Sequence, residues 1–110
     1  VIAIVDNNKI GATDFTKNFS CVEPLDKKFR SFGWECKKVR GHSIKDIYEN
    51  LKKFSNSKNG KPKVLICETI KGKGLDFLEN DPSWHSRPLS DELKLKGSKI
   101  LGLKLWKTNH

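Results

Sequence analysis

A polar segment, Asp6-Asn7-Asn8, directly follows the apolar run from Val1 to Val5. A continuous β-branched run of this kind predicts a strand buried on both faces, as in the parallel sheet of an α/β protein. Ligands of open α/β sheets bind just beyond the carboxyl ends of such strands. The amide oxygen of Asn8 is a hard ligand that suits Mg²⁺ or Ca²⁺. A polar turn is the simpler interpretation of an Asn-Asn pair taken alone.

His85 is the second candidate, in a long loop after the third predicted strand. Imidazole titrates near neutral pH and can hydrogen-bond a phosphate oxygen or a substrate hydroxyl, although an isolated loop histidine is more often inert. In the same loop, Lys71-Gly72-Lys73-Gly74 resembles a phosphate-binding segment but lacks the spacing of a P-loop. His42 is interpreted as structural, and His110 is uninformative.

The hydrophobic pattern predicts the elements that position these residues. We expect strands at 1–5, 34–39 and 64–67, helices at 25–32 and 44–54, long loops at 9–21 and 70–89, and an amphipathic segment from residue 90. Ser43 is a typical N-cap, Gly33 a typical helix stop, and the strand at 34–39 is expected near a sheet edge. Gly97 and Gly102 leave the helical state of the last segment open. The order predicts an α/β fold with a parallel βαβαβ sheet and a C-terminal helical segment.

Composition limits the classes of function. The net charge is +9, from 22 basic and 13 acidic residues, but the lysines are dispersed, so a nucleic-acid role is not favoured. Three widely spaced cysteines without a CxxC pattern predict free thiols, with Cys36 and Cys67 buried in strands, and hence a reducing, cytoplasmic location. No apolar run approaches the roughly 20 residues of a membrane span.

Seven short motifs occur in an order that is more specific than any one of them. They are IVDNN, EPL before a short helix, FGW, V-x-GH, GKP before a strand, KGKG and NDPSWH. In this order they resemble the N-terminal, thiamine-diphosphate-binding region of transketolases, most closely the two-subunit bacterial and archaeal type. The resemblance covers roughly Val1 to Leu101.

The resemblance implies roles for three residues. Asn8 would bind Mg²⁺ through its side chain and lie against the diphosphate of the cofactor, and Ile10 would give its backbone carbonyl to the metal. His85 would be a catalytic and cofactor-binding residue that orients the diphosphate and the sugar. Thiamine diphosphate and Mg²⁺ are the implied cofactors. The implied reaction moves a two-carbon ketol unit from a ketose phosphate to an aldose phosphate, with the protein positioning the cofactor that performs the carbanion chemistry.

The Gly-Asp-Gly half of the cofactor motif does not occur in these 110 residues. We therefore expect residues 1–110 to be the C-terminal portion of a thiamine-diphosphate-binding domain that is inactive alone. The expected partners are the upstream Gly-Asp-Gly segment and a pyrimidine-binding half or subunit, in a dimeric assembly. The KIGATDFT loop, Arg40 and Ser43 depart from the pattern of the family, which leaves the activity of this copy open.

Three alternatives remain open at this stage. One is another enzyme of the same fold, either deoxyxylulose-phosphate synthase or a 2-oxoacid dehydrogenase component. The NDPSWH segment favours transketolase over these two, because its histidine follows a tryptophan in the loop after KGKG. The second is a non-catalytic basic module for nucleic acid or an acidic partner, which salt-sensitive binding to random DNA would support. The third is a degenerate remnant.

Overall fold

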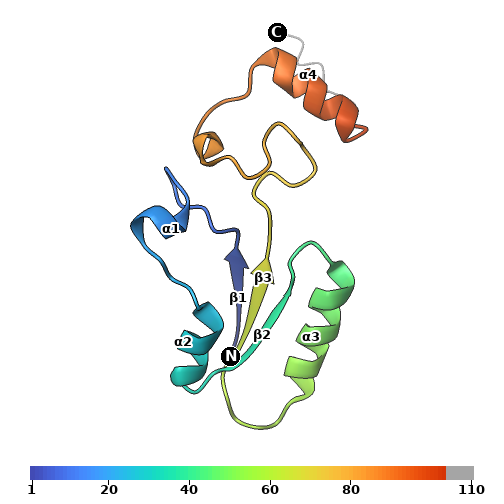
Figure 1. The fold of residues 1–110 in the computed structure, drawn as a ribbon. Coiled ribbons are helices and arrows are strands. Elements are labelled where there is room, and N and C mark those ends of the chain that lie inside the picture. The colour runs from blue at the N-terminus through green and yellow to red at the C-terminus, as the bar shows by residue number, and fades with distance from the viewer. Residues whose placement is uncertain (104–110) are drawn as a thin grey trace.

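The computed structural model describes residues 1–103, which form a parallel sheet with helices packed on both faces (Figure 1). The central strand, β3 (Lys63–Glu68), pairs in parallel with β1 (Ile2–Asn7) on one side and β2 (Glu35–Arg40) on the other. The helical segments are α1 (Thr16–Phe19), α2 (Leu25–Ser31), α3 (Ile44–Asn56), the short 3-10 helix η1 (Pro82–Trp84) and α4 (Asp91–Ile100). The predicted α/β fold is confirmed, including the βαβαβ order and the C-terminal helix.

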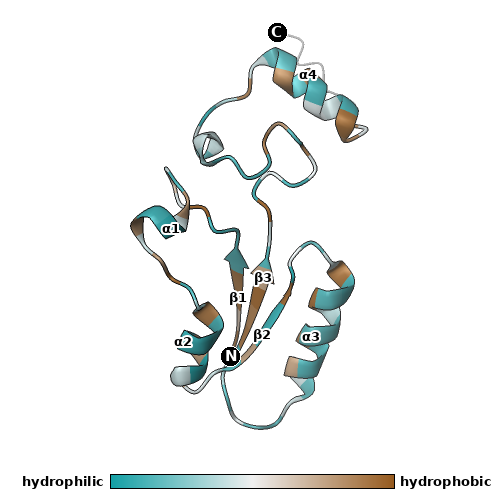
Figure 2. Ribbon diagram, viewed as in Figure 1, coloured by the Kyte–Doolittle hydropathy of each residue, from teal (hydrophilic) through white to brown (hydrophobic). Residues whose placement is uncertain are grey.

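Strand β3 is the centre of the core because both of its faces are covered. Alternate residues of a strand point to opposite faces, so the two faces pack on different helices. Figure 2 shows hydrophobic residues along β3. The face toward α3 contains Val39, Phe54, Leu65 and Cys67, with Ile47 and Leu51 against them. The face toward α2 contains Cys36, Val64 and Ile66, with Ala3, Val5, Leu25, Phe29 and Trp34 against them.

Strand β1 differs from the prediction in one respect, because only one of its faces is buried. Ala3 and Val5 pack on the α2 side, but Ile2 and Ile4 on the other face are 42% and 59% exposed. The physical reason is that β1 is an edge strand in the described residues and that α3 packs against β2 and β3. The prediction of burial on both faces is therefore wrong for β1 in this structure, whereas the edge position of β2 is confirmed.

Local side-chain signals set several helix ends, and Ser43 and Gly33 act as predicted. The hydroxyl of Ser43 accepts a hydrogen bond from the N–H of Asp46 (3.2 Å), and the hydroxyl of Ser90 accepts one from the N–H of Leu93 (3.3 Å). These bonds satisfy backbone donors that a first helical turn leaves unpaired. Gly33 follows α2 with a φ of 83°, a left-handed conformation that glycine adopts without a steric penalty.

Helix α1 lies within the segment 9–21, which was predicted to be only loop. The carboxylate of Asp14 accepts hydrogen bonds from the N–H of Phe15 (2.6 Å) and the side chain of Asn18 (2.9 Å), which stabilises this single turn. A turn of four residues is too short to display helical periodicity, so the hydrophobic pattern did not predict it.

Helix α4 and the long loop before it lie beyond the carboxyl ends of the strands (Figure 1). The helix continues through Gly97, where an added Cβ would lie 3.5 Å from the side chain of Leu75 and 3.7 Å from that of Phe77. Gly102 follows the helix with a φ of 65°. In residues 1–103, no helix is long and apolar enough to cross a membrane. His110 and the other residues of 104–110, the end of the predicted domain, lie outside the described residues.

Candidate functional site

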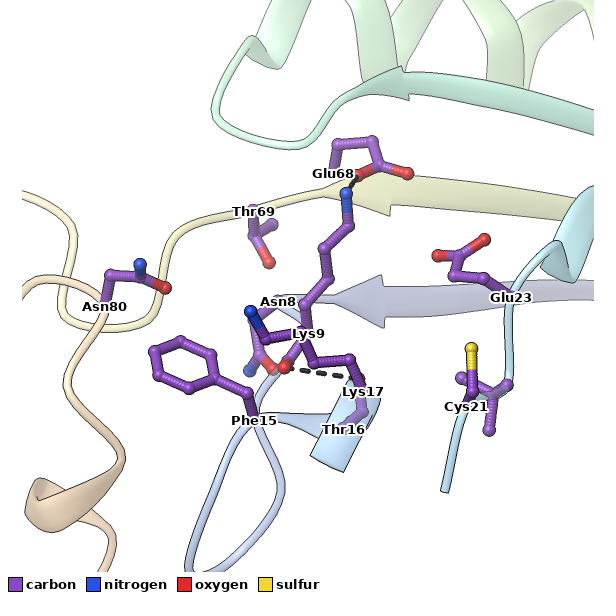
Figure 3. Close-up of a pocket in the computed structure, with 11 residues that line it drawn as sticks. Asn8, Lys9, Phe15, Thr16, Lys17, Cys21, Glu23, Glu68, Thr69 and Asn80 are labelled. Atoms are coloured by element: carbon purple, nitrogen blue, oxygen red, sulfur yellow. Dashed lines mark hydrogen bonds and ion pairs between the residues drawn. The ribbon is translucent and has the colours of Figure 1, made fainter. Parts of the chain in front are cut away.

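A pocket of about 320 Å³ lies at the carboxyl ends of β1 and β3, between the loops that follow them (Figure 3). This is the edge at which parallel α/β sheets bind their ligands. The polar part of its lining comes from both strand ends and from the two loops, and includes Asn8, Lys9, Glu23, Glu68, Thr69 and Asn80. The pocket therefore combines oxygen donors with both signs of charge.

Asn8 begins a tight turn that also contains Lys9 and Ile10. Its side-chain oxygen accepts a hydrogen bond from the N–H of Ile10 (2.9 Å) and, having two lone pairs, can accept a second interaction. The carbonyl of Lys9 accepts from the N–H of Thr16 (2.9 Å), and Ile10 forms an antiparallel bridge with Phe15. The structure thus brings the two predicted metal ligands, Asn8 and Ile10, into one turn.

A polar network lies beside this turn, on the face of the sheet that packs on α2. The side-chain amide of Asn7, which is 6% exposed, donates to Glu23 (2.8 Å) and to Glu68 (3.1 Å). The second oxygen of Glu68 pairs with the ammonium of Lys9 (3.2 Å). The network therefore joins the segment before α2 to the ends of β1 and β3 and to the Asn8 turn.

Hydrogen bonds and nearby positive charges favour the ionised form of Glu23. The hydrogen bond from Asn7 is the largest cause that lowers the pKa of Glu23 below its ordinary value, followed by the N–H of Leu25 and the charges of Lys38 and Lys9. Lys38 pairs with Asp26 (3.0 Å), and this contact raises the pKa of Lys38 and lowers that of Asp26.

The Gly41-His42 pair holds the start of the loop after β3. The ring nitrogen Nε2 of His42 accepts a hydrogen bond from the N–H of Ile70 (2.7 Å), which confirms its structural role. A Cβ on Gly41 would lie 2.3 Å from the methyl group of Thr69 and 2.8 Å from the carbonyl oxygen of Glu68. Only glycine permits this approach, and Thr69, which also hydrogen-bonds Asp6, is thereby held at the pocket.

The KGKG segment folds back on the glutamate that follows it. The N–H of Gly74 donates to the carboxylate of Glu79 (3.0 Å), and Lys73 lies 3.5 Å from the same oxygen. The N–H of Asn80 donates to the carbonyl of Lys71 (2.9 Å), which closes the turn. Because Glu79 already occupies groups that would receive a phosphate, this turn is a self-contained structure in the described residues.

His85 follows η1, is exposed, and is not among the described residues that line the pocket. The carboxylate of Asp81 caps η1 by accepting from the N–H of Ser83 (2.9 Å). The loop reaches the pocket through Asn80, five residues earlier, which has a φ of 55°. The structure thus places Asn8 and Ile10 together and leaves His85 apart from them.

The oxygen atoms of the Asn8 turn suit a hard cation whose other ligands come from outside the turn. Within residues 1–103, no group of three or more His, Cys, Asp or Glu side chains could hold a metal ion. A cation here would use the Asn8 amide oxygen and the Ile10 carbonyl, with the remaining oxygens coming from a ligand or from other segments. Mg²⁺ is commonly bound in this way, by few protein ligands together with phosphate oxygens.

Sequence reasoning did not identify Asn7, Lys9, Glu23 or Glu68 as site residues. A signal was present for two of them: the alternation that buries Ala3 and Val5 places Asn7 on the same face, and strand register sets it opposite Glu68. Glu23 carries no comparable signal, because its approach to Asn7 depends on the path of the loop before α2.

Comparisons with known proteins agree on one family. The family model of the transketolase thiamine diphosphate binding domain matches residues 1–108. One of the subunits of the apulose-4-phosphate transketolase of Actinobacillus succinogenes is 42% identical over 96 residues, which are 86% of this chain and 34% of that protein. Human transketolase is 33% identical over 89 residues, which are 81% of this chain and 14% of that protein.

The fold leads to the same family. The crystal structure of transketolase from Campylobacter jejuni superposes with a TM-score of 0.81 and 27% identity, covering 93% of this chain and 16% of that one. The chain thus spans about a third of the length of its Actinobacillus relative and a smaller share of the longer transketolases. With a family match over nearly all of its length and the same fold in a solved transketolase, this chain belongs to the transketolase family, within the thiamine diphosphate-binding domain.

Proposed function

We propose that this chain forms part of a transketolase that transfers a two-carbon ketol unit from a ketose phosphate to an aldose phosphate. The observation that carries the proposal is the Asn8–Ile10 turn, which opens on a pocket at the carboxyl end of β1 in a chain of this family. Thiamine diphosphate, when bound, supplies the carbanion chemistry of such a transfer. The task of the chain is to bind and orient the cofactor and the sugar.

Three residues would carry this task. The Asn8 side-chain oxygen and the Ile10 carbonyl would bind Mg²⁺ beside the cofactor diphosphate, and support for this comes from their position in one turn at the pocket. His85 would orient the diphosphate and the sugar, because imidazole can donate or accept a hydrogen bond near neutral pH. Its support is that the same loop reaches the pocket through Asn80.

The working enzyme would contain further segments. Two of the relatives, from Actinobacillus succinogenes and from a Clostridium species, are named as subunits of transketolases, and this chain covers 34% of each. We therefore propose that an upstream segment supplies a carboxylate to the metal, and that a pyrimidine-binding half or subunit completes a dimeric assembly. The isolated chain would then be inactive. All three cysteines are free, which supports a reducing, cytoplasmic location.

This proposal accounts for more observations than the alternatives do. The relatives are named as transketolases, which favours ketol transfer over the reactions of other thiamine diphosphate enzymes. Two lysines near the pocket pair with carboxylates, Lys9 with Glu68 and Lys38 with Asp26, so part of the basic charge at this edge is compensated. A nucleic-acid module would instead use such lysines as an open basic surface.

The test is isothermal titration calorimetry, in which thiamine diphosphate is titrated into the complete assembly at saturating Mg²⁺. We expect Asn8→Ala to weaken binding by at least about tenfold, as loss of a metal ligand or its support does. Asn8→Asp keeps an oxygen for both the metal and the N–H of Ile10, so it should retain binding. Electron paramagnetic resonance of Mn²⁺, used in place of Mg²⁺, would report metal binding independently of turnover.

The matched control is Asn56→Ala, an exposed asparagine at the end of α3. It should leave cofactor and Mn²⁺ affinity unchanged. Wild-type affinity for both in Asn8→Ala would refute the metal assignment. Loss of binding in Asn8→Ala together with full retention in Asn8→Asp would support it, because the two variants differ in whether the oxygen is present.

A further inference from the structure

Lys9 occupies an unusual position between the two proposed metal ligands. Its φ of 61° lies in the left-handed region, which side chains other than glycine enter at a steric cost. Its backbone is tied to the following loop, because its carbonyl accepts from the N–H (2.9 Å) and the hydroxyl (3.2 Å) of Thr16. A residue in this conformation persists only where its surroundings hold it.

The Lys9 side chain is held from the neighbouring strand. Figure 3 shows it extending from the end of β1 to Glu68 at the end of β3, where the ammonium and carboxylate are 3.2 Å apart. Glu68 is itself fixed, because its other oxygen accepts from the buried amide of Asn7 (3.1 Å), which also donates to Glu23 (2.8 Å). The contact therefore connects the turn to a part of the sheet that is well ordered by hydrogen bonds.

We propose that Lys9 and Glu68 are positioning residues, which hold the Asn8–Ile10 turn in the shape that presents its oxygens to a divalent cation. This inference rests on the proposed function, because it assigns a purpose to the turn. Glu68 would act through Lys9, and Lys9 through the backbone that it shares with Asn8 and Ile10. Neither side chain would touch the metal.

A different role for Lys9 makes opposite predictions. If its ammonium attracted the diphosphate directly, loss of the charge would weaken binding whatever residue stood at position 68. We call the Lys9–Glu68 ion pair a clamp if its only role is to hold the turn. Loss of either residue then breaks the same contact, and loss of both weakens cofactor binding no further. A double-mutant cycle separates the two, because residues that act as a unit have non-additive effects.

The experiment uses the complete assembly and titrates thiamine diphosphate at a fixed, subsaturating Mg²⁺ concentration. Lys9→Met and Glu68→Gln should each weaken binding about three- to tenfold, the range between a partly exposed ion pair and a support of a metal ligand. The double variant should be no weaker than either single variant. Lys9→Gly should recover affinity to within about twofold of wild type, because glycine adopts a φ of 61° without strain.

A second readout separates positioning from a general loss of structure. Lys9→Met, Glu68→Gln and the double variant should lose affinity for the cofactor without a matching fall in the melting temperature of the cofactor-free assembly. The matched control is Lys17→Met, a lysine that also lines the pocket but lies over the ring of Phe15 (5.8 Å). Its effect should add to that of Glu68→Gln.

Two results would overturn the proposal that Lys9 and Glu68 form a clamp. They are additive losses in the Lys9→Met and Glu68→Gln cycle, and a Lys9→Gly variant as weak as Lys9→Met. If Asn8→Ala weakens cofactor binding while Glu68→Gln does not, the clamp fails and the proposed function stands. If Asn8→Ala binds the cofactor and Mn²⁺ normally, the metal assignment fails and the clamp fails with it.

Discussion

The two faces of the sheet have different characters at the carboxyl ends of the strands. On the face toward α3, apolar packing continues to Val39 and Cys67, which lie beside each other in adjacent strands. On the face toward α2, the apolar residues give way to Asn7 and Glu68, which join Glu23 in a polar network. One face of the same three strands therefore stabilises the fold, while the other also builds the edge of a ligand pocket.

This difference shows how a short parallel sheet can do both tasks. Side chains alternate between faces, so a strand can end in polar residues on one face without breaking the core on the other. The cost of burying Asn7 is offset because its amide hydrogens have carboxylate acceptors. The comparison leads to four predictions, which begin with the largest expected effect.

The largest effect is expected from the buried core on the α3 face of β3. Leu65→Ala removes a side chain with 0% exposure, and we expect it to lower the free energy of unfolding of the assembly by about 2–5 kcal/mol through lost burial and a residual cavity. Leu95→Ala, on α4 at 47% exposure, is the matched control and should cost far less. Denaturant titration measures both, and equal losses would contradict the assignment of the core.

A substitution at His85 tests whether activity can be lost while the stability of the fold is kept. His85 is exposed and follows η1, so His85→Ala should leave the melting temperature unchanged. If it orients the diphosphate and the sugar, kcat/KM should fall by about a hundredfold, the lower range for a positioned acid or base. Steady-state kinetics of the complete assembly measure this, with His42→Ala as a contrasting variant that should lose stability. Wild-type kinetics in His85→Ala would remove it from the site.

Asn7 tests whether the polar network also stabilises the fold. Asn7→Ala leaves Glu23 and Glu68 without the amide that both accept from. We expect the free energy of unfolding to fall by about 1–3 kcal/mol, which is typical when buried polar groups lose a hydrogen-bond partner. Asn18→Ala, which truncates an exposed amide bonded to Asp14, is the control and should lose less. Similar melting temperatures for the two variants would contradict the network.

Glu23 gives the smallest effect, as a dependence of stability on pH. Its pKa in the folded protein lies below the ordinary value of 4.5, so its ionised form stabilises the fold. That contribution is complete above about pH 4.5 and is lost as the pH falls through the lower folded pKa. The difference in unfolding free energy between wild type and Glu23→Gln should therefore be constant near neutral pH and shrink below about pH 4.5.

The control for this titration is Glu92→Gln, an exposed glutamate in the first turn of α4. Its difference from wild type, measured over the same range of pH, is the baseline for the Glu23→Gln difference. A Glu23→Gln difference that stayed constant from neutral pH to well below about pH 4.5 would show that Glu23 stabilises the fold by a contact that does not depend on its charge.

The main elements could be predicted from sequence because their signals are local. Alternating and continuous apolar runs identified the three strands, and Ser43, Ser90 and Gly33 marked helix ends through bonds or backbone angles within a few residues. Helix α1 was not predicted, because a single turn is too short to show helical periodicity. The exposure of Ile2 and Ile4 was not predicted, because burial depends on which helix covers a strand, and the strand's own residues do not specify this.

The sequence by itself determined the α/β order of this chain, the strand end that carries Asn8 and the motifs that resemble a transketolase. Each of these depends on residue types at short, fixed spacings. Only the tertiary structure decided that Glu68 reaches Lys9, that Asn7 joins Glu23 to Glu68, and that Asn80 rather than His85 lines the pocket. These contacts join residues far apart in the chain, because they depend on parallel register and loop paths that no local pattern specifies.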